Sequence, residues 1–266
     1  MLEVRPPPAP IEAPRNTSFI SIAHLAKEYP GNKQIIHDLS LTATSGEFVS
    51  ILGASGCGKS TLLKMIAGLS SISGGSIHID GMTPENAREI MSFVFQDPSL
   101  LPWRTVARNV ELALELEGLP RSLRARRVDS VLRLVGLREV SSYYPRQLSG
   151  GMKMRVSIAR ALATTPRLLL MDEPFGAVDA MTRNRLNEEL LALKARQRWT
   201  TIFVTHSITE AVFLSDRIVL MRANPGRVLQ EIAVPLAFPR TADIRSDPAF
   251  LGLVGQVSRA LSAIHS

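Results

Sequence analysis

Apolar residues are spaced in two ways along the chain, and each spacing predicts a different kind of strand. Over residues 19–25 and 35–44 they alternate with polar residues, which predicts two antiparallel strands with one buried face. The turn Tyr29-Pro30-Gly31-Asn32 separates these strands. Residues 48–52 predict a short buried strand, and the continuous apolar run at 168–171 predicts a strand covered on both faces, as in a parallel sheet. The chain therefore predicts both kinds of sheet.

Helical spacing dominates the middle of the chain. Residues 106–116 and 123–135 repeat apolar positions at three and four, which predicts two helices between strands at 92–95 and 168–171. The other predicted elements are a hairpin from 76–79 through Asp80-Gly81, helices over 62–67 and 152–163, strands at 201–205 and 217–221, and a helix beginning near Ser207. This alternation favours an α/β fold with a parallel sheet, an N-terminal antiparallel β subdomain and an inserted α-helical subdomain.

The same pattern sets the expected boundaries. Residues 1–17 include Pro6-Pro7-Pro8 and Pro10 and are expected to form a disordered or extended leader. The main domain is expected over 18–240, with the helical subdomain at about 97–150. Residues 241–266 are expected to form a helical tail packed on that domain. Its apolar residues fall on one helical face, namely Phe250, Leu253, Val254, Val257, Leu261 and Ile264.

Composition narrows the class of protein. Hydrophobic residues make up 45% and charged residues 21%, which is ordinary for a globular domain. No apolar run approaches the roughly 18 residues of a membrane-spanning helix, and 1–16 lack the apolar core of a secretory signal. The single cysteine, Cys57, cannot form an intrachain disulfide, which fits a reducing compartment. We therefore expect a cytoplasmic protein that is not itself an integral membrane protein.

The net charge of +7 is compatible with two kinds of partner, nucleic acid and the anionic inner face of a membrane. Composition does not decide between them. The cluster Arg121, Arg124, Arg126 and Arg127 fits a solvated helix face. Aromatic residues are only 5% of the chain, so a stacking platform for single-stranded nucleic acid is unsupported.

A glycine-rich segment carries the strongest chemical signal. It reads Gly53-Ala54-Ser55-Gly56-Cys57-Gly58-Lys59-Ser60-Thr61 and fits G-x-x-x-x-G-K-[ST] between a predicted strand and a predicted helix. Its glycines let successive N–H groups converge on phosphate oxygens, and the helix start adds further donors. Lys59 supplies charge for the outer phosphates, Ser60 a hydroxyl for Mg²⁺, and Thr61 a contact to an inner phosphate. The segment predicts a nucleotide site, and nucleotide is expected to shield Cys57 from thiol reagents.

Four other residues acquire a role beside such a loop. Asp172 ends an apolar strand, where a carboxylate can hold the Mg²⁺ shell, and Glu173 can then orient or deprotonate the attacking water. As a pair they could equally be a turn or capping feature. His206 also ends an apolar strand, where it is either structural or in contact with the γ-phosphate and Glu173. Tyr29 is either a turn or core aromatic or a stacking partner for adenine.

Taken together, these motifs resemble the ATP-binding subunit of an ABC transporter over almost all of residues 18–234. Gly53–Thr61 resembles the Walker A loop, and 168–173 the Walker B strand with its catalytic glutamate. The remaining resemblances are Gln96 to the Q-loop glutamine, Leu148-Ser149-Gly150-Gly151 to the signature, Phe175 to Asp179 to the D-loop, His206 to the switch histidine, and Tyr29 to the aromatic that stacks on adenine. Met154 replaces a more usual glutamine and Val178 a more usual leucine.

The resemblance implies a mechanism and its partners. It implies ATP and Mg²⁺ as cofactors, with Ser60, Gln96 and Asp172 as metal ligands and Glu173 and His206 as catalytic residues. It implies a head-to-tail dimer in which Ser149, Gly150 and Gly151 of a second copy cover the ATP, with Asp179 also at the nucleotide site. Further implied partners are transmembrane permease subunits and, indirectly, a periplasmic solute-binding protein, with no nucleic acid. The expected location is then the cytoplasmic face of the inner membrane, as a peripheral subunit.

Three shorter segments resemble one subgroup, which energises uptake of nitrate, taurine and aliphatic sulfonates. They are Leu100 to Arg104, Asp172 to Phe175 and Ala223 to Arg227. The Leu-Pro-Trp run could also be only a packed turn. An exporter ATPase remains an alternative, as does, less favoured, an ABC ATPase acting on DNA. The interval 97–147 is too short for the long coiled coils of the DNA-acting class, and the chain has one cassette where translation factors have two. Substrate identity is not encoded in an ATPase subunit.

Overall fold

The computed structural model describes residues 18–31, 33–176 and 178–265. The expected leader at 1–17 lies outside these residues. The strands are β1 (Ile20–Tyr29), β2 (Lys33–Ala43), β3 (Phe48–Gly53), β4 (Gly74–Ile79), β5 (Met91–Val94), β6 (Leu168–Asp172), β7 (Thr200–Val204), β8 (Arg217–Arg222) and β9 (Arg227–Ala233). The helices are α1 (Lys59–Ile66), α2 (Val106–Leu116), α3 (Arg121–Leu134), α4 (Gly150–Ala163), α5 (Ala180–Gln197), α6 (Ile208–Leu214) and α7 (Pro248–His265).

Two sheets organise the described residues. A three-stranded antiparallel sheet has the order β2-β1-β4, and a six-stranded sheet has the order β5-β6-β7-β3-β8-β9. In the larger sheet β5 to β8 are parallel, with Val49 opposite both Ile202 and Arg217, and β9 runs antiparallel to β8. The prediction of an α/β fold with a parallel core sheet and an antiparallel β subdomain is confirmed, apart from the antiparallel edge strand.

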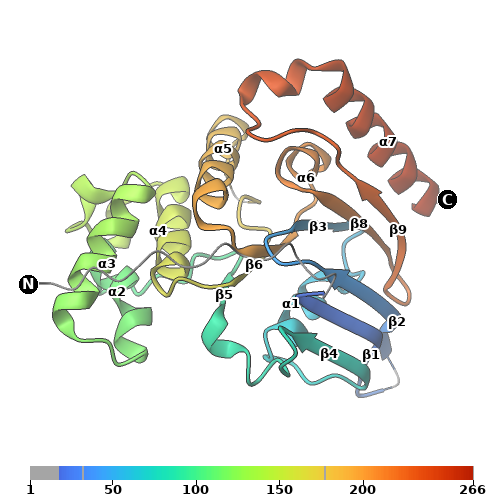
Figure 1. The fold of residues 1–266 in the computed structure, drawn as a ribbon, viewed down its shortest axis with the longest axis horizontal. Helices are drawn as coiled ribbons and strands as arrows, with labels where there is room; N and C mark the ends of the chain where they lie inside the picture. The colour runs from blue at the N-terminus through green and yellow to red at the C-terminus, as the bar shows by residue number, and fades with distance from the viewer. Residues whose placement is uncertain (1–17, 32, 177, 266) are drawn as a thin grey trace, which may run out of the picture.

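The helices divide into those covering the larger sheet and those beside it. Figure 1 shows α2, α3 and α4 grouped at one end of the molecule, with the antiparallel sheet toward the other. α1 packs on β3, β6 and β7, while α6 packs on β3 and on α7. The chain thus leaves the sheet after β5, builds the helical unit and returns as β6, as the inserted apolar repeats predict.

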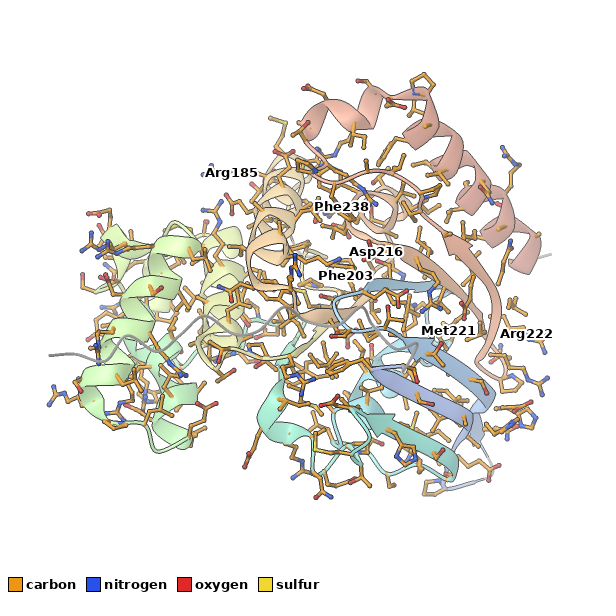
Figure 2. The ribbon with its side chains drawn as sticks, viewed as in Figure 1. Arg185, Phe203, Asp216, Met221, Arg222 and Phe238 are labelled. Atoms are coloured by element: carbon orange, nitrogen blue, oxygen red, sulfur yellow. The ribbon has the colours of Figure 1, made fainter. Side chains whose placement is uncertain are left out.

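The core lies on both faces of the larger sheet. Phe48 and Leu52 of β3 belong to the hydrophobic cluster under α4, α5 and α6, whereas Val49 and Ile51 face the cluster that includes α1 and the antiparallel sheet. This division follows from the period of two along a strand. Phe203 of β7 contacts the ring of Phe48 at 5.6 Å between centroids, and it lies inside the molecule in Figure 2. Burial on both faces explains the uninterrupted apolar run at 168–171 in β6.

Two elements were not among those predicted. The first turns of α5 are almost wholly polar, and its apolar face is confined to later residues such as Leu186 and Leu190. β9 pairs on one side only, and its central residues 229–231 are exposed, so it lacks an apolar run. The predicted hairpin at Asp80-Gly81 is also wrong in its pairing. β4 pairs with β1, and the turn closes only through Ile79 and Met82.

A buried arginine, Arg240, anchors the start of the C-terminal tail to the end of α6. Arg240 is 4% exposed, and its guanidinium donates hydrogen bonds to the carbonyls of Val212, Phe213 and Ser215 at the end of α6. Burial lowers the pKa of Arg240 to about 10. The helix dipole and these carbonyls stabilise the charge. Beyond it, Phe250 and Val257 of α7 are buried in the main core. None of the helices in the described ranges is both long and apolar enough to cross a membrane.

Candidate active site

The glycine-rich loop lies between β3 and α1, as its sequence requires. Gly56 and Gly58 have φ values of +78° and +95°, a region that side chains disfavour, and Gly58 is the N-cap of α1. Lys59 is 5% exposed, and its Nζ donates hydrogen bonds to the carbonyls of Gly53 (2.8 Å) and Ala54 (2.9 Å). The ammonium group therefore closes the loop on itself at the point where phosphates are expected. Ser55 and Gly56 lie at the exposed rim of the loop.

The loop is supported from behind by the segment that joins β8 to β9. A Cβ on Gly53 would lie 2.4 Å from the Met221 carbonyl oxygen, and one on Gly226 would lie 2.2 Å from the Cys57 carbonyl oxygen. Gly226 also bonds to β2, since its N–H donates to Ile35 and its carbonyl accepts from His37. Such close contacts allow no side chain at either glycine. The subgroup-like segment from Ala223 to Arg227 is thus a structural support of the loop.

The backbone of Cys57 is part of the loop, whereas its side chain packs in the hydrophobic core. The residue is 1% exposed and belongs to the cluster that contains Ile51 and Leu62. Burial raises the pKa of its thiol. The expectation that nucleotide shields Cys57 from thiol reagents is therefore wrong, because the protein already covers the sulfur. Sequence could not show this, since the loop pattern leaves that position free.

The carboxylates at the end of β6 face the loop. Ser60 Oγ donates a hydrogen bond of 3.0 Å to Asp172 Oδ1, which joins the two motifs 112 residues apart in sequence. Burial raises the pKa of Asp172, which is 9% exposed. A hydroxyl and a carboxylate side by side are ligands that suit Mg²⁺. The turn-or-capping alternative for Asp172 is not supported, because its carboxyl contacts α1 and not its own turn.

Glu173 and His206 meet in the structure. Glu173 Oε1 lies 2.5 Å from His206 Nε2, while the side chain of His206 stays 50% exposed. Glu173 has a φ of +46°, an unfavourable conformation that costs about 1–3 kcal/mol, and its N–H donates to the Val204 carbonyl of the neighbouring strand. The fold therefore holds this carboxylate in a strained position beside an exposed histidine. This arrangement suits a group that accepts a proton from water.

Gln96 lies at the edge of this site, and Tyr29 lies at the end of β1. Gln96 follows β5 and is exposed, and its Nε2 lies 3.6 Å from the position that a Cβ on Gly176 would occupy. Its amide therefore reaches the turn that carries Glu173. Tyr29 ends β1, is 43% exposed and lies under Lys27 Nζ at 4.8 Å from the ring centroid. It is not a core aromatic, and its free ring face is compatible with stacking.

The signature and D-loop residues contact each other. Ser149 is the N-cap of α4 and accepts a hydrogen bond from Met152 N–H, and Asp179 caps α5 by accepting one from Thr182 N–H. That bond holds the pKa of Asp179 below its usual value. A Cβ on Gly151 would lie 2.8 Å from Thr182 Cγ2, whereas Gly150 is open. Across the described residues, no hydrogen bond or ion pair joins Ser149, Gly150 or Gly151 to the glycine-rich loop.

A buried network that sequence reasoning missed connects the D-loop to the histidine. Thr205 Oγ1 donates to Glu210 and accepts from Ser207 N–H. Glu210 Oε1 lies 3.7 Å from Arg183 Nε, and Arg183 Nη2 donates to the Val178 carbonyl at 2.8 Å. Burial raises the pKa of Glu210, which is 5% exposed. In the sequence, the only sign of this network is the acidic residue Glu210 within the mostly apolar stretch 208–214.

The Leu-Pro-Trp run after Gln96 is an ordered, exposed turn. Asn109 is fully buried, and its side chain accepts a hydrogen bond from Leu101 N–H and donates to the carbonyls of Leu101 and Arg104. Trp103, which these bonds hold in place, is 71% exposed. The interpretation of this run as merely a packed turn is therefore wrong for Trp103. An exposed indole on a fixed turn is typical of a contact surface.

Comparison with known proteins identifies the family of this chain. Residues 36–176 match the family described as ABC transporter. The chain is 45% identical over 241 residues to the aliphatic sulfonates import ATP-binding protein of Ralstonia nicotianae, covering 91% of this chain and 80% of that protein. It is 43% identical over 242 residues to the taurine import ATP-binding protein of Escherichia coli O157:H7, covering 88% and 94%.

This chain belongs to the ABC transporter family. A solved structure described as a dimeric, post-hydrolysis ATP-binding cassette with ADP and Pi matches it with a TM-score of 0.73 and 32% identity, covering 82% of this chain and all of the other. The chain is thus an ATP-binding, ATP-hydrolysing cassette, and the glycine-rich loop with its facing carboxylates is its candidate nucleotide site. The resemblance drawn from the ordered motifs is confirmed.

Proposed function

We propose that this cassette energises import of a small anionic solute, of the nitrate, taurine or aliphatic sulfonate type, through a separate permease. The contact of Glu173 with His206, beside an Asp172 that is bonded to the loop serine, is the observation that carries the ATPase part. The import part is supported by the named importers among its relatives. Further support is the exposed Trp103 turn, which gives a permease a fixed surface.

The proposed hydrolysis uses residues from two copies of the chain. Lys59 and the N–H groups of Gly53 to Thr61 bind the phosphates, and Glu173 accepts a proton from the attacking water while His206 holds its Oε1. Ser149, Gly150 and Gly151 of the second copy present the N-terminus of α4 to the same phosphates. Support comes from the exposure of Ser149 and Gly150 and from the absence, within the described residues, of a bond from this segment to its own loop.

Mg²⁺ fits the oxygen donors at this site. We infer that Ser60 and Asp172, joined at 3.0 Å, would hold it with the Gln96 amide oxygen, while Tyr29 stacks on adenine and Asp179 approaches the nucleotide from the dimer interface. Bound there, the ion neutralises charge on the phosphates. We propose that the assembly lies on the cytoplasmic face of the inner membrane, as a peripheral subunit, with a periplasmic solute-binding protein as an indirect partner.

Uptake by cells that lack the gene for this chain tests the transport assignment. Cells carrying the parental chain are expected to accumulate radiolabelled taurine, ethanesulfonate or nitrate, and cells carrying Glu173→Gln are expected not to. Glu231→Gln is the matched control, because Glu231 lies on the edge strand β9 and pairs with Arg217. Tagged chain purified from membranes should also bring down a permease. Recovery of nucleic acid without a permease, or equal uptake by the Glu173→Gln cells, would contradict the proposal.

A further inference from the structure

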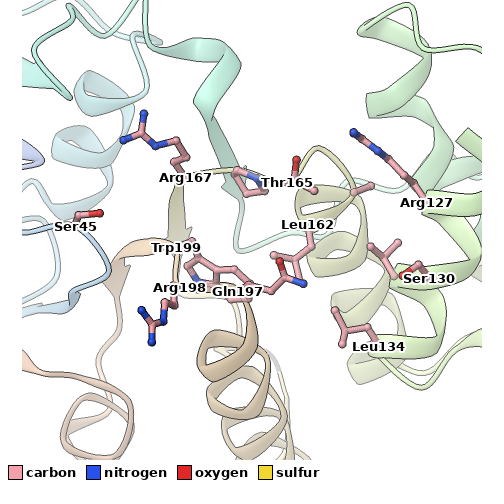
Figure 3. A pocket seen from close by; sticks show the side chains of 13 residues that line it. Ser45, Arg127, Ser130, Leu134, Leu162, Thr165, Arg167, Gln197, Arg198 and Trp199 are labelled. Carbon is pink, nitrogen blue, oxygen red and sulfur yellow. The ribbon is translucent and has the colours of Figure 1, made fainter. Parts of the chain in front are cut away.

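A pocket whose lining shares no residue with the candidate nucleotide site lies between the helical unit and the sheet domain. Its volume is about 370 Å³. Figure 3 shows Arg127, Ser130 and Leu134 of α3 on one side, with Gln197 and Trp199 opposite and Leu162 between them. The other lining residues are Ser45, Val131, Ala163, Thr165, Pro166, Arg167 and Arg198. The pocket therefore lies where the helical unit joins the sheet domain, since the segment between α4 and β6 is part of its lining.

The lining is cationic. It contains three arginines, and none of its thirteen described residues is acidic. Arg167 is partly neutralised, since its Nη1 lies 2.5 Å from Asp80 Oδ2. Arg127 and Arg198 have no side-chain hydrogen bond or ion pair to any residue in the described ranges. Two unpaired guanidinium groups in a concave site raise the local concentration of anions.

The pocket also offers neutral donors beside an apolar wall. Trp199 is 2% exposed and lines the pocket, but its indole Nε1 is buried from solvent, so the ring contributes apolar surface to the cavity and no donor. Ser130, Thr165 and Gln197 add two hydroxyls and an amide, while Val131, Leu134 and Leu162 supply apolar surface. Neutral donors and apolar contacts in one cavity are typical of a small-molecule site.

We propose that this pocket binds a small organic anion, with a sulfonate or carboxylate head and a short apolar chain. The head would accept hydrogen bonds from Arg127 and the neutral donors, and the chain would lie against Leu134 and Leu162. A volume of about 370 Å³ lies near the lower end of the range for small-molecule sites, so the pocket accommodates such a ligand.

Such a ligand would act on the distant nucleotide site through α4. Ala163, which lines the pocket, is the last residue of this 14-residue helix, and Gly150 is its first. The helix spans about 20 Å, so a ligand at one end fixes the direction in which the other end presents Ser149 to Gly151. Bound anion therefore slows ATP hydrolysis by restraining the helical unit. This consequence, though not the binding itself, rests on the composite site proposed above.

The sequence offers a built-in fluorescent reporter for the test. Trp103 and Trp199 are the two tryptophans, so Trp103→Phe leaves Trp199 as the only one. Titration of this variant with sodium butanesulfonate or butanoate is expected to give a saturable change in emission. Inorganic sulfate should bind at least about tenfold more weakly because it has no apolar chain, and butylammonium should give no saturable change.

Two neighbouring arginines separate specific binding from general charge. Arg127→Gln in the same background should weaken butanesulfonate binding about tenfold, as expected for one charge-assisted hydrogen bond. Arg126→Gln makes the same change of charge one residue away, on an exposed side chain outside the pocket, and should leave the affinity unchanged. No saturable emission change with either anion, an equal effect of the two substitutions, or equal affinity for inorganic sulfate would overturn the site.

Hydrolysis and nucleotide binding are measured on the same samples. Saturating butanesulfonate should lower the ATPase rate of the parental chain at least twofold and leave the rate of Arg127→Gln unchanged at the same concentration. An unchanged parental rate would overturn the regulatory part. If butanesulfonate binds but the parental chain hydrolyses no ATP, the proposed catalytic site fails and the anion site stands. If ATP is hydrolysed normally and no anion binds, only the anion site fails.

Discussion

At the scale of single residues, the candidate active site depends on a residue whose backbone conformation is unfavourable in an isolated chain. Glu173 has a left-handed backbone and a carboxylate 2.5 Å from His206. The hydrogen bond of its N–H to β7 fixes this geometry from outside the β6 turn. The strain is therefore sustained by the sheet, and the carboxylate has little freedom to leave the position where water is expected.

Removal of the Glu173 charge should separate ATP binding from hydrolysis. Glu173→Gln keeps the size and a hydrogen bond to His206 but cannot accept a proton, so the hydrolysis rate should fall about 100-fold or more. Mg-ATP affinity should stay within about threefold of the parental value. Phosphate release and equilibrium binding of a fluorescent ATP analogue measure the two quantities. A variant that hydrolyses ATP at the parental rate would refute the role assigned to Glu173.

Glu210 predicts a pH dependence of stability with a definite sign. Burial raises its pKa in the folded state, so the folded chain holds the proton more tightly than the unfolded chain. As the pH rises above about 4.5, the ordinary pKa of glutamic acid, the free energy of unfolding contributed by this group should therefore fall. Gln cannot titrate, so the parental chain should lose stability relative to Glu210→Gln between pH 4 and 7. Urea unfolding of both proteins across this range tests the sign, and the opposite slope contradicts it.

At the scale of elements, the glycine-rich loop is built by three segments that are distant in sequence. β3 and α1 supply its ends, and the turn between β8 and β9 closes its back at Gly226. Sequence patterns identify the first two because strand, loop and helix are contiguous. The third is recognisable only as a resemblance, since nothing local to Ala223–Arg227 shows that it contacts Cys57.

Substitution of Gly226 should damage the loop without touching nucleotide. In Gly226→Ala the new methyl group would lie 2.2 Å from the Cys57 carbonyl oxygen, so backbone must move, at a cost of about 1–3 kcal/mol. We expect a lower melting temperature and a weaker ATP affinity. Gly252→Ala on α7, where a Cβ meets nothing within 4 Å, is the control: it should keep the ATP affinity and should not lower the melting temperature, because alanine favours a helix more than glycine does. Calorimetry measures the melting temperature and ATP titration the affinity. A Gly226→Ala variant that binds ATP with the parental affinity would contradict the role of Gly226 in supporting the loop.

At the scale of the whole molecule, one chain holds half of each proposed ATP site. The glycine-rich loop and the N-terminus of α4 belong to different units of the fold, and within the described ranges no bond joins them. A solved relative is described as a dimer with ADP and Pi. Both observations support a site completed by a second copy.

Mixing two inactive variants tests this arrangement. Lys59→Ala removes the loop charge, and Ser149→Arg blocks the exposed end of α4, so each should be inactive alone. A mixed dimer keeps one intact loop facing one intact α4. Random pairing gives half mixed dimers with one intact site each, so an equal mixture should recover roughly a quarter of the parental ATPase rate. No recovery, with both variants still folded by circular dichroism, would count against the composite site.

The sequence by itself determined the motifs and most of the elements, because both are local, but it did not reveal α5 or β9. Alternating and continuous apolar runs predicted the strands other than β9. A nucleotide site was indicated by Gly53 to Thr61, Asp172-Glu173 and His206. The domain boundaries at 17, 97–150 and 240 remain predictions of the same kind.

Only the tertiary structure decided how separate segments meet. Local pattern does not encode the pairing of β4 with β1, the burial of the Cys57 thiol, the Glu210 network or the cationic pocket between α3 and Trp199. Each depends on contacts between residues many positions apart, and those contacts exist only after the sheet has set the order and register of its strands.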